Sequence, residues 1–260
     1  MLVTLTDVSK GFLDETILEK INMSINEGDK IGLMGVNGAG KTTLLNIIAG
    51  ILPCDEGTVS KKSNLEIGYL QQNEALDDDN TLEEEIKSAL ERTYTVRRLM
   101  AEISAKMASA DVGSDGYKRL ESEYAALDNE YTALDGYTAD TRINRVLTGL
   151  GFHDFDLKMK TSALSGGEKM RFGMAKILLR NPELLILDEP TNHLDFSMLA
   201  WLEDYIKSYK GAVLTVSHDR YFLDNIVSSI YEIEQKHIYK YKGGYSAFIK
   251  QKEERAASCA

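Results

Sequence analysis

The sequence has few cysteines, no long apolar run and no excess of positive charge, and each shortage excludes a class of protein. Its two cysteines, Cys54 and Cys259, lie far apart and outside any metal-type spacing, which favours a reduced cytoplasmic protein over a disulfide-stabilised secreted one. The longest apolar stretches have the length of buried strands and fall short of a membrane span. The first residues alternate like a strand and lack the basic-then-apolar pattern of a signal peptide. We therefore expect a cytoplasmic chain with no stable membrane insertion.

Positive charge is scarce as well. The 41 acidic residues outnumber the 30 basic ones, which gives a formal net charge of −11 and a pI of about 5.0. No bulk attraction to nucleic acid or to an anionic membrane is expected from this balance. The net charge does not exclude a local basic patch that binds either one. With 260 residues, of which 43% are hydrophobic, the chain can bury a sizeable core as one large α/β domain or two small ones.

Strand-like and helix-like segments alternate along most of the chain. Alternating or short apolar patterns predict strands at residues 2–8, 17–25, 30–34, 65–70, 184–187 and 212–216. The runs at 184–187 and 212–216 are typical of buried parallel strands, and each follows a helix-length segment. We expect an α/β fold with a mostly parallel core sheet, an antiparallel β subdomain and a helical subdomain.

Residues 91–136 contain no proline and no strand signal. Apolar residues recur three or four positions apart on both sides of the turn-rich segment 112–116, at Val96, Leu99, Ile103 and Met107 and then at Leu120, Tyr124, Leu127, Tyr131 and Leu134. Two such stripes joined by a glycine turn predict an antiparallel helical hairpin. We place it at residues 92–138, as an arm inserted in a single domain of residues 1–260. The alternative is a helical subdomain packed on the body of the protein.

The segment from Gly35 to Thr42, GVNGAGKT, follows a strand and opens a helix, which is the setting that a phosphate-binding P-loop requires. Its glycines let backbone N–H groups approach phosphate oxygens, and the helix N-terminus adds its dipole. Lys41 supplies a positive charge for the β- and γ-phosphates, and the Thr42 hydroxyl is a predicted Mg²⁺ ligand. The predicted ATP contacts of this segment are Gly35, Asn37, Gly38, Ala39, Gly40, Lys41, Thr42 and Thr43.

Two carboxylates end the apolar strand that begins at Leu184, and a histidine follows the next strand. Ligands of open α/β sheets bind at the carboxyl ends of the strands. Because a carboxylate at the end of a buried strand is costly without a nearby cation, we assign Asp188 to Mg²⁺, directly or through water. Glu189 is placed to polarise the attacking water, and His218 is placed to contact the γ-phosphate. These residues predict an ATPase with ATP and Mg²⁺ as its ligands.

Together with these residues, further motifs resemble the ABC ATPase family. The segment LSGGE that begins at Leu164 resembles the family signature, and residues 190–195 and 217–219 resemble the D-loop and the switch-histidine motif. The resemblance implies a P-loop NTPase fold of the ABC type. It also implies that the signature caps the γ-phosphate of ATP held on a second ABC domain, through Ser165, Gly166, Gly167 and Glu168.

The resemblance implies two more ATP contacts outside these motifs. Phe12 is similar to the aromatic residue that stacks on adenine, and an ordinary buried phenylalanine in a strand is the alternative. A Q-loop glutamine, which contacts ATP and Mg²⁺, is expected near residue 72. Gln72 is preferred to Gln71 because of its distance from the strand, and the choice between the two stays open.

Within the family the chain resembles the ABC-F branch, whose members are soluble ATPases that act on ribosomes. LSGGE in place of LSGGQ, LDEPTNHLD at 187–195, SHDRYFLD at 217–224 and the segment 241–248 all resemble that branch. The predicted hairpin lies where ABC-F proteins carry their arm. The resemblance implies the ribosome, through rRNA or tRNA, as a partner, in translation or in antibiotic resistance. Residues 92–138 hold six basic and eight acidic side chains, so whether the arm contacts RNA stays open.

ABC-F proteins carry two ABC domains, whereas this chain has one P-loop and one signature. We therefore expect half of a longer protein, with residues 246–260 starting a linker helix, or else a homodimer. In both cases a second ABC domain completes the ATP site, so hydrolysis by the isolated chain should be weak. The alternative functions are the ATP-binding subunit of an ABC membrane transporter, which has no use for the hairpin, and a binding-only domain. The presence of Lys41, Glu189 and His218 disfavours the binding-only domain.

Overall fold

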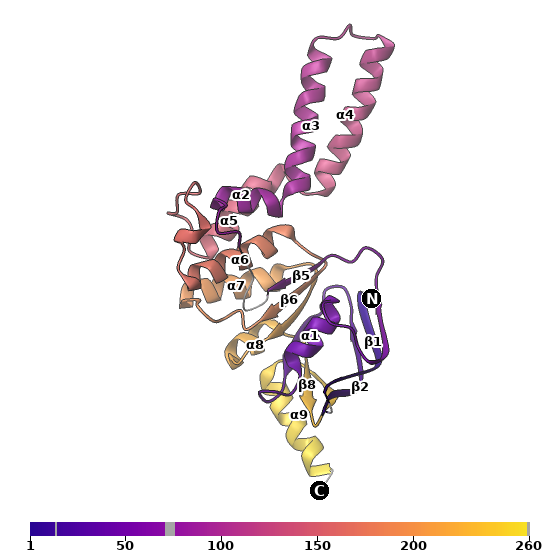
Figure 1. Cartoon of the computed structure of the whole chain (residues 1–260), viewed down its shortest axis with the longest axis vertical. Helices are drawn as coiled ribbons and strands as arrows, with labels where there is room; N and C mark the ends of the chain where they lie inside the picture. The colour runs from indigo at the N-terminus through magenta and orange to yellow at the C-terminus, as the bar shows by residue number, and fades with distance from the viewer. Residues whose placement is uncertain (14, 71–75, 259–260) are drawn as a thin grey trace. The chain divides into compact units, whose positions relative to one another are not determined.

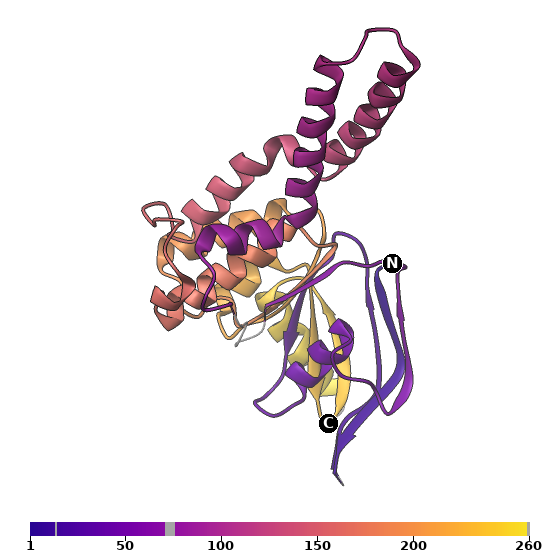
Figure 2. The same cartoon turned by 45° about the horizontal axis from the view of Figure 1, so that its top comes forward.

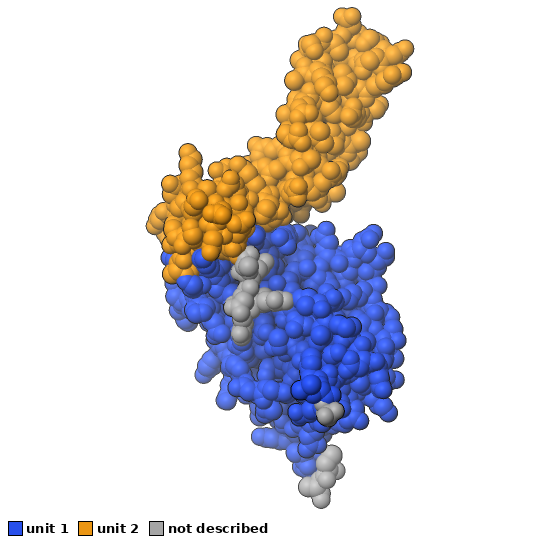
Figure 3. All heavy atoms as spheres, viewed as in Figure 1, with its two compact units in different colours: residues 1–75, 166–260 blue, residues 76–165 orange. Residues whose placement is uncertain are grey.

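A computed structural model describes residues 1–13, 15–70 and 76–258, and it separates into two units (Figures 1 and 3). The first unit holds residues 1–75 and 166–260, and the second holds residues 76–165. In the order of the chain, the second unit is therefore an insertion within the first.

The first unit is organised around a six-stranded sheet. Its strand order is β5 (Ile67–Leu70), β6 (Leu184–Asp188), β7 (Ala212–Val216), β3 (Lys30–Met34), β8 (Ser229–Glu234) and β9 (His237–Lys242). Neighbouring strands are parallel except for β8 and β9, which form an antiparallel hairpin. Strands β6 and β7 are buried throughout, as continuous apolar runs covered on both faces should be. Their carboxyl ends, Asp188 and Val216, pair side by side at one edge of the sheet.

A second, antiparallel sheet shares a hydrophobic core with the first. Its order is β2 (Glu15–Ile25), β1 (Val3–Phe12) and β4 (Glu56–Lys61). Inward-facing residues of β1 and β2, among them Leu5 and Leu18, belong to one buried cluster with Leu44 and Ile48 of helix α1 (Lys41–Ala49). This shared core fixes the β1–β2 hairpin beside the start of α1.

The described residues of the first unit form four more helices. They are α6 (Gly166–Arg180), α7 (Phe196–Ser208), α8 (Arg220–Ile226) and α9 (Tyr245–Ser258). Helix α6 carries most of its buried side chains toward its C-terminus and ends where Asn181, with a left-handed φ of 52°, precedes Pro182. Helix α9 is held to α8 because Asp224 accepts hydrogen bonds from the N–H and the hydroxyl of Ser246, at 3.0 and 2.6 Å.

The second unit is helical. It comprises α2 (Leu82–Ala89), α3 (Glu91–Ala108), α4 (Asp115–Ala133) and α5 (Ala139–Gly149), with short 3-10 turns η1 (Gly136–Thr138) and η2 (Thr161–Ala163). Figures 1 and 2 show α3 and α4 running antiparallel beside each other. Val96, Met100 and Tyr131 form a small core between them, and Arg92 pairs with Glu130 at 2.5 Å. Across the two units, the described residues include no helix that is both long and apolar enough to cross a membrane.

Candidate nucleotide-binding site

The loop between β3 and α1 turns tightly at its glycines. Gly38 and Gly40 adopt left-handed φ angles of 83° and 98°, and the N–H of Ala39 donates to the carbonyl of Val36 at 3.1 Å. A Cβ at Gly40 would lie 2.7 Å from Cγ2 of Ile17, so this position needs glycine both for its conformation and for the close approach of β2. The loop leads directly into the N-terminus of α1, where unpaired N–H groups and the helix dipole favour an anion.

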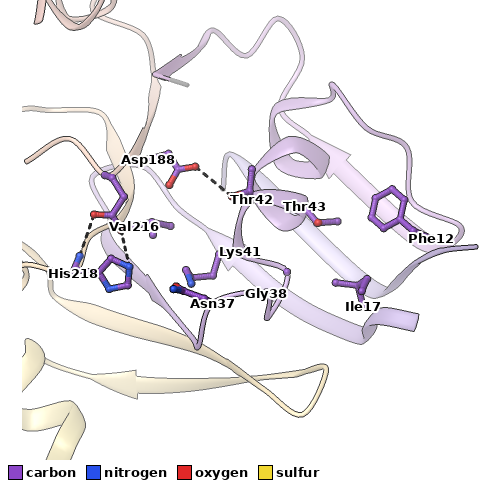
Figure 4. Close-up of a pocket in the computed structure, with 12 residues that line it drawn as sticks. Phe12, Ile17, Asn37, Gly38, Lys41, Thr42, Thr43, Asp188, Val216 and His218 are labelled. Carbon is purple, nitrogen blue, oxygen red and sulfur yellow. Dashed lines mark hydrogen bonds and ion pairs between the residues drawn. The ribbon is translucent and has the colours of Figure 1, made fainter. Parts of the chain in front are cut away.

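The ammonium group of Lys41 is held by the same loop. It donates to the carbonyl of Gly35 at 2.8 Å and to the carbonyl of Val36 at 3.1 Å. Figure 4 shows the lysine beside Asn37. A cation held beside the backbone N–H groups of such a loop is suited to bind phosphate oxygens.

Two oxygen atoms meet where β6 ends near the start of α1. The Thr42 hydroxyl donates to Oδ2 of Asp188 at 3.4 Å, and the Asp188 residue is only 6% exposed. Burial raises the pKa of Asp188, while the hydrogen bond from Thr42 and the charge of Lys41 lower it. A buried carboxylate that is costly to ionise gains from a cation, and hydroxyl and carboxylate oxygens are ligands that Mg²⁺ accepts. The residues present therefore fit a magnesium ion bound through Thr42 and Asp188.

A buried carboxylate and an exposed imidazole follow, at the ends of β6 and β7. Glu189 has a left-handed φ of 53°, and its N–H donates to the carbonyl of Val216 at 2.9 Å. The N–H of His218 donates to Oε2 of Glu189 at 3.3 Å, and the imidazole Nε2 lies 3.4 Å from Oε1. The Glu189 side chain is 10% exposed and the His218 side chain 71%. Burial raises the pKa of the Glu189 carboxyl, which the contacts with His218 oppose. The pair thus presents a proton acceptor with an exposed polar neighbour.

These side chains line one cleft of about 400 Å³. Its lining residues are Phe12, Ile17, Asn37, Gly38, Gly40, Lys41, Thr42, Thr43, Asp188, Glu189, Val216 and His218. Figure 4 shows Phe12 and Ile17 on one side of Thr43, and Asp188 and His218 on the other side. The arrangement can hold phosphates at Lys41 and leaves an aromatic surface at the opposite end.

The sequence reasoning missed two of the lining residues, Ile17 and Val216. Val216 ends the strand that directly precedes the Ser217–Asp219 motif, and this position was a usable signal. Ile17 had no such signal, because it reaches the cleft only through the register of the β1–β2 hairpin, in which Lys10 pairs with Leu18.

Some predicted site residues do not line the cleft. Gly35 supports the loop from behind, since a Cβ there would lie 2.9 Å from the carbonyl oxygen of Ile233, and Ala39 packs on the hydrophobic core. Ser165 ends the second unit. Gly166, Gly167 and Glu168 open α6 in the first unit, and they are not among the described residues that line the cleft. Gln71 and Gln72 lie outside the described residues.

Comparisons with known proteins agree with this geometry. A sequence model of the family described as ABC transporter matches residues 18–192. The chain is 42% identical to the "Putative ATP-binding protein YdiF" of Bacillus subtilis, over 97% of this chain and 39% of the relative. It is 38% identical to the "Energy-dependent translational throttle protein EttA" of Escherichia coli K12, over 93% of this chain and 42% of the relative. The chain thus spans about two fifths of the length of these relatives.

A solved structure gives the fold independently of close sequence similarity. It is titled "Dimeric structure of a post-hydrolysis state of the ATP-binding cassette MJ0796 bound to ADP and Pi", and it aligns with a TM-score of 0.61 at 22% identity, over 93% of this chain and 98% of that chain. The predicted α/β P-loop fold, with its mostly parallel sheet, antiparallel sheet and helices, is confirmed. YdiF and EttA are also consistent with the predicted ABC-F resemblance. The chain belongs to the ABC transporter family, as one of its ATP-binding ATPase domains.

Proposed function

We propose that this chain binds and hydrolyses ATP with Mg²⁺ in a site that a second ABC domain completes, and that closure of the two domains over ATP lets the whole protein bind the ribosome. The observation that carries the hydrolytic part is the meeting of Lys41, Thr42, Asp188, Glu189 and His218 around one cleft. Phosphate-binding, metal-binding and proton-accepting groups come together there from three different strand ends.

Each of these residues has a role that follows from its chemistry. The loop N–H groups and Lys41 bind the β- and γ-phosphates, and Phe12 stacks on the adenine. Thr42 and Asp188 hold Mg²⁺, which supplies positive charge to the phosphate oxygens. Glu189 accepts a proton from the attacking water, and its buried setting keeps its basicity above that of an exposed carboxylate. His218, next to Glu189 and largely exposed, contacts the γ-phosphate.

A second domain enters the proposal through the signature. Gly166, Gly167 and Glu168 begin a helix of 15 residues, a setting suited to an anion, yet they do not line the described cleft. The related cassette MJ0796 is dimeric in its solved structure. We therefore assign Ser165 to Glu168 to the γ-phosphate of ATP held on another ABC domain.

A mixing experiment with this chain tests the shared site. Lys41→Met removes the positive charge that we propose binds the phosphates. Ser165→Arg places a large charged side chain in the signature and so blocks its contact with ATP. Each variant alone should show almost no phosphate release, whereas an equal mixture should recover about a quarter of the wild-type rate. Random pairing makes half of the dimers mixed, and each mixed dimer has one intact site. Undiminished hydrolysis by Ser165→Arg alone, at concentrations where the chain is monomeric, would show that the site is complete within one domain.

A relative's name and the helical hairpin support the proposed action on the ribosome. EttA, a relative at 38% identity, is named a translational throttle protein, and the α3–α4 hairpin lies where ABC-F proteins carry their arm. The same resemblance supports a cytoplasmic location. The full-length protein with Glu189→Gln should sediment with purified ribosomes when ATP is present, and Lys41→Met should not. Binding to membrane vesicles with an ABC transporter partner, and none to ribosomes, would favour the transporter subunit instead.

A further inference from the structure

An ion pair between a buried lysine and a half-exposed aspartate lies next to the aromatic end of the cleft. Lys10, two residues before Phe12 on β1, is only 9% exposed, and its ammonium lies 2.5 Å from Oδ1 of Asp55. Asp55 stands just before β4 and also binds the backbone of β1. Its Oδ2 accepts the N–H of Gly11 at 2.8 Å, and its own N–H donates to the carbonyl of Ser9 at 2.9 Å. Asp55 therefore holds both the Lys10 ammonium and the backbone of β1 just before Phe12.

The lysine also contacts the aromatic ring. Its Nζ lies 5.5 Å from the centroid of the Phe12 ring, within the range of a cation–π interaction. The ring itself is half exposed and lines the cleft. It stands at the end of β1, directly before Leu13, whose φ of 55° starts the hairpin turn. A ring in this place needs support if it is to be oriented before a ligand arrives.

The free-energy cost of burying the Lys10 ammonium indicates that this residue has a role beyond tying the two segments together. Burying an ammonium group is costly, and a paired carboxylate reduces the cost without abolishing it. The hydrogen bonds from Lys10 and from the N–H of Gly11 hold the pKa of Asp55 below its ordinary value, so this carboxylate stays ionised at neutral pH. A structural tie between β1 and the segment before β4 would need only the two backbone hydrogen bonds of Asp55. The lysine adds the contact with the ring.

We propose that Lys10, held in place by Asp55, is a positioning residue for nucleotide binding, which fixes the Phe12 ring in the orientation that stacks on the base. This inference rests on the proposed role of Phe12 as the adenine platform. Orienting the ring in advance lowers the entropy lost when the base stacks on it. The effect should therefore appear only for ligands that carry a base.

The test compares two ligands of the 260-residue chain, Mg-ATP and magnesium tripolyphosphate, which has the phosphates but no base. Affinities are measured by isothermal titration calorimetry for the wild type, Lys10→Met, Asp55→Asn, Lys10→Arg, Phe12→Ala and the double variant Lys10→Met/Phe12→Ala. Lys62→Met is the matched control, because it removes a lysine–carboxylate pair with Glu183 in the same unit away from the cleft. Circular dichroism and thermal melting show that each variant is folded, and Asp55→Asn serves if Lys10→Met is not.

We expect Lys10→Met and Asp55→Asn to weaken ATP binding about threefold to tenfold and to leave tripolyphosphate binding unchanged. Lys10→Arg should restore most of the ATP affinity, because it keeps a cation beside the ring. Lys10→Met should add nothing in the Phe12→Ala background, and Lys62→Met should change neither affinity.

The outcomes separate this inference from the proposed function. If Phe12→Ala weakens ATP but Lys10→Met and Asp55→Asn do not, the positioning role is wrong and the adenine platform stands. Equal weakening of ATP and tripolyphosphate by Lys10→Met overturns the positioning role too, because a general distortion of the cleft acts on both ligands. If Phe12→Ala leaves the ratio of the two affinities unchanged, the adenine platform itself is wrong, and the role of Lys10 is wrong with it.

Discussion

Two glycines of the nucleotide loop should respond very differently to the same substitution. Both Gly38 and Gly40 have left-handed backbone angles, so alanine is strained at either position. Around Gly38, a Cβ would meet no atom within 4 Å. At Gly40, it would lie 2.7 Å from Cγ2 of Ile17 and 3.0 Å from Cδ2 of Leu18. Leu18 is fully buried and cannot move without disturbing the core.

The expected losses of stability follow from these surroundings. The left-handed conformation costs an alanine about 1–2 kcal/mol relative to glycine, and this term applies to both variants. Crowding a packed core adds about 1–3 kcal/mol, and this term applies only to Gly40. We therefore expect Gly38→Ala to lower the free energy of unfolding by about 1–2 kcal/mol and Gly40→Ala to lower it by about 2–5 kcal/mol.

Equilibrium unfolding in urea measures this difference. The single tryptophan of the chain, Trp201, lies in α7 of the same unit, so its fluorescence reports on the unit that carries both glycines. The dependence of the unfolding free energy on urea should be the same for both variants, because neither changes the surface exposed on unfolding. Equal losses for the two variants would refute the argument that β2 restricts the loop at Gly40. A larger loss at Gly38 would refute it more strongly.

Three other perturbations have expected outcomes. Glu189→Gln should lower the rate of phosphate release about 10²- to 10⁴-fold with ATP affinity retained, and an unchanged rate would exclude Glu189 as the base. Thr81→Ala removes the capping box with Glu84 at the start of α2 and should cost about 1 kcal/mol in thermal unfolding followed by circular dichroism, with the exposed Thr132→Ala as a neutral control. Hydrogen bonds from Ser246 hold the pKa of Asp224 below its ordinary 3.8. Their stabilisation is therefore present above about pH 4 and lost as the pH falls, and Asp224→Asn should flatten that part of the pH dependence of unfolding.

The phosphate end of the cleft is predictable because it is local in sequence. Strand, glycine loop and helix follow one another directly in the chain, and for that reason alone the groups from Asn37 to Thr43, except Ala39, line the same cleft. Asp188 and His218 are predictable for a related reason, since each stands at the end of an apolar strand and parallel strand ends share one edge of a sheet.

The helical hairpin shows where sequence periodicity stops being informative. The stripe in its first helix predicts Val96, Leu99, Ile103 and Met107 as the inward face. In the structure Met100 is buried in place of Leu99, and Met107 is only partly buried. The positions of the partner residues on α4, above all Tyr131, decide which side of α3 is covered. A spacing of three or four residues predicts a helix, but it determines which side of the helix is buried only to within about one residue.

The aromatic end of the cleft, where we propose that the base binds, depends on contacts that no local sequence pattern contains. Ile17 reaches Gly40 through a hairpin register, and Lys10 meets Asp55 across 45 positions of sequence. The two ends therefore respond differently to change. A substitution in the glycine loop should act directly on the phosphates that we propose it binds, whereas one in β1 or before β4 should act through the antiparallel sheet. Because both sheets share one core with α1, a nucleotide that touches both ends of the cleft ties them together, and its binding energy adds to the stability of the whole unit. At equal saturation, ATP should consequently protect the backbone N–H groups of the β1–β2 hairpin from hydrogen exchange more than tripolyphosphate does.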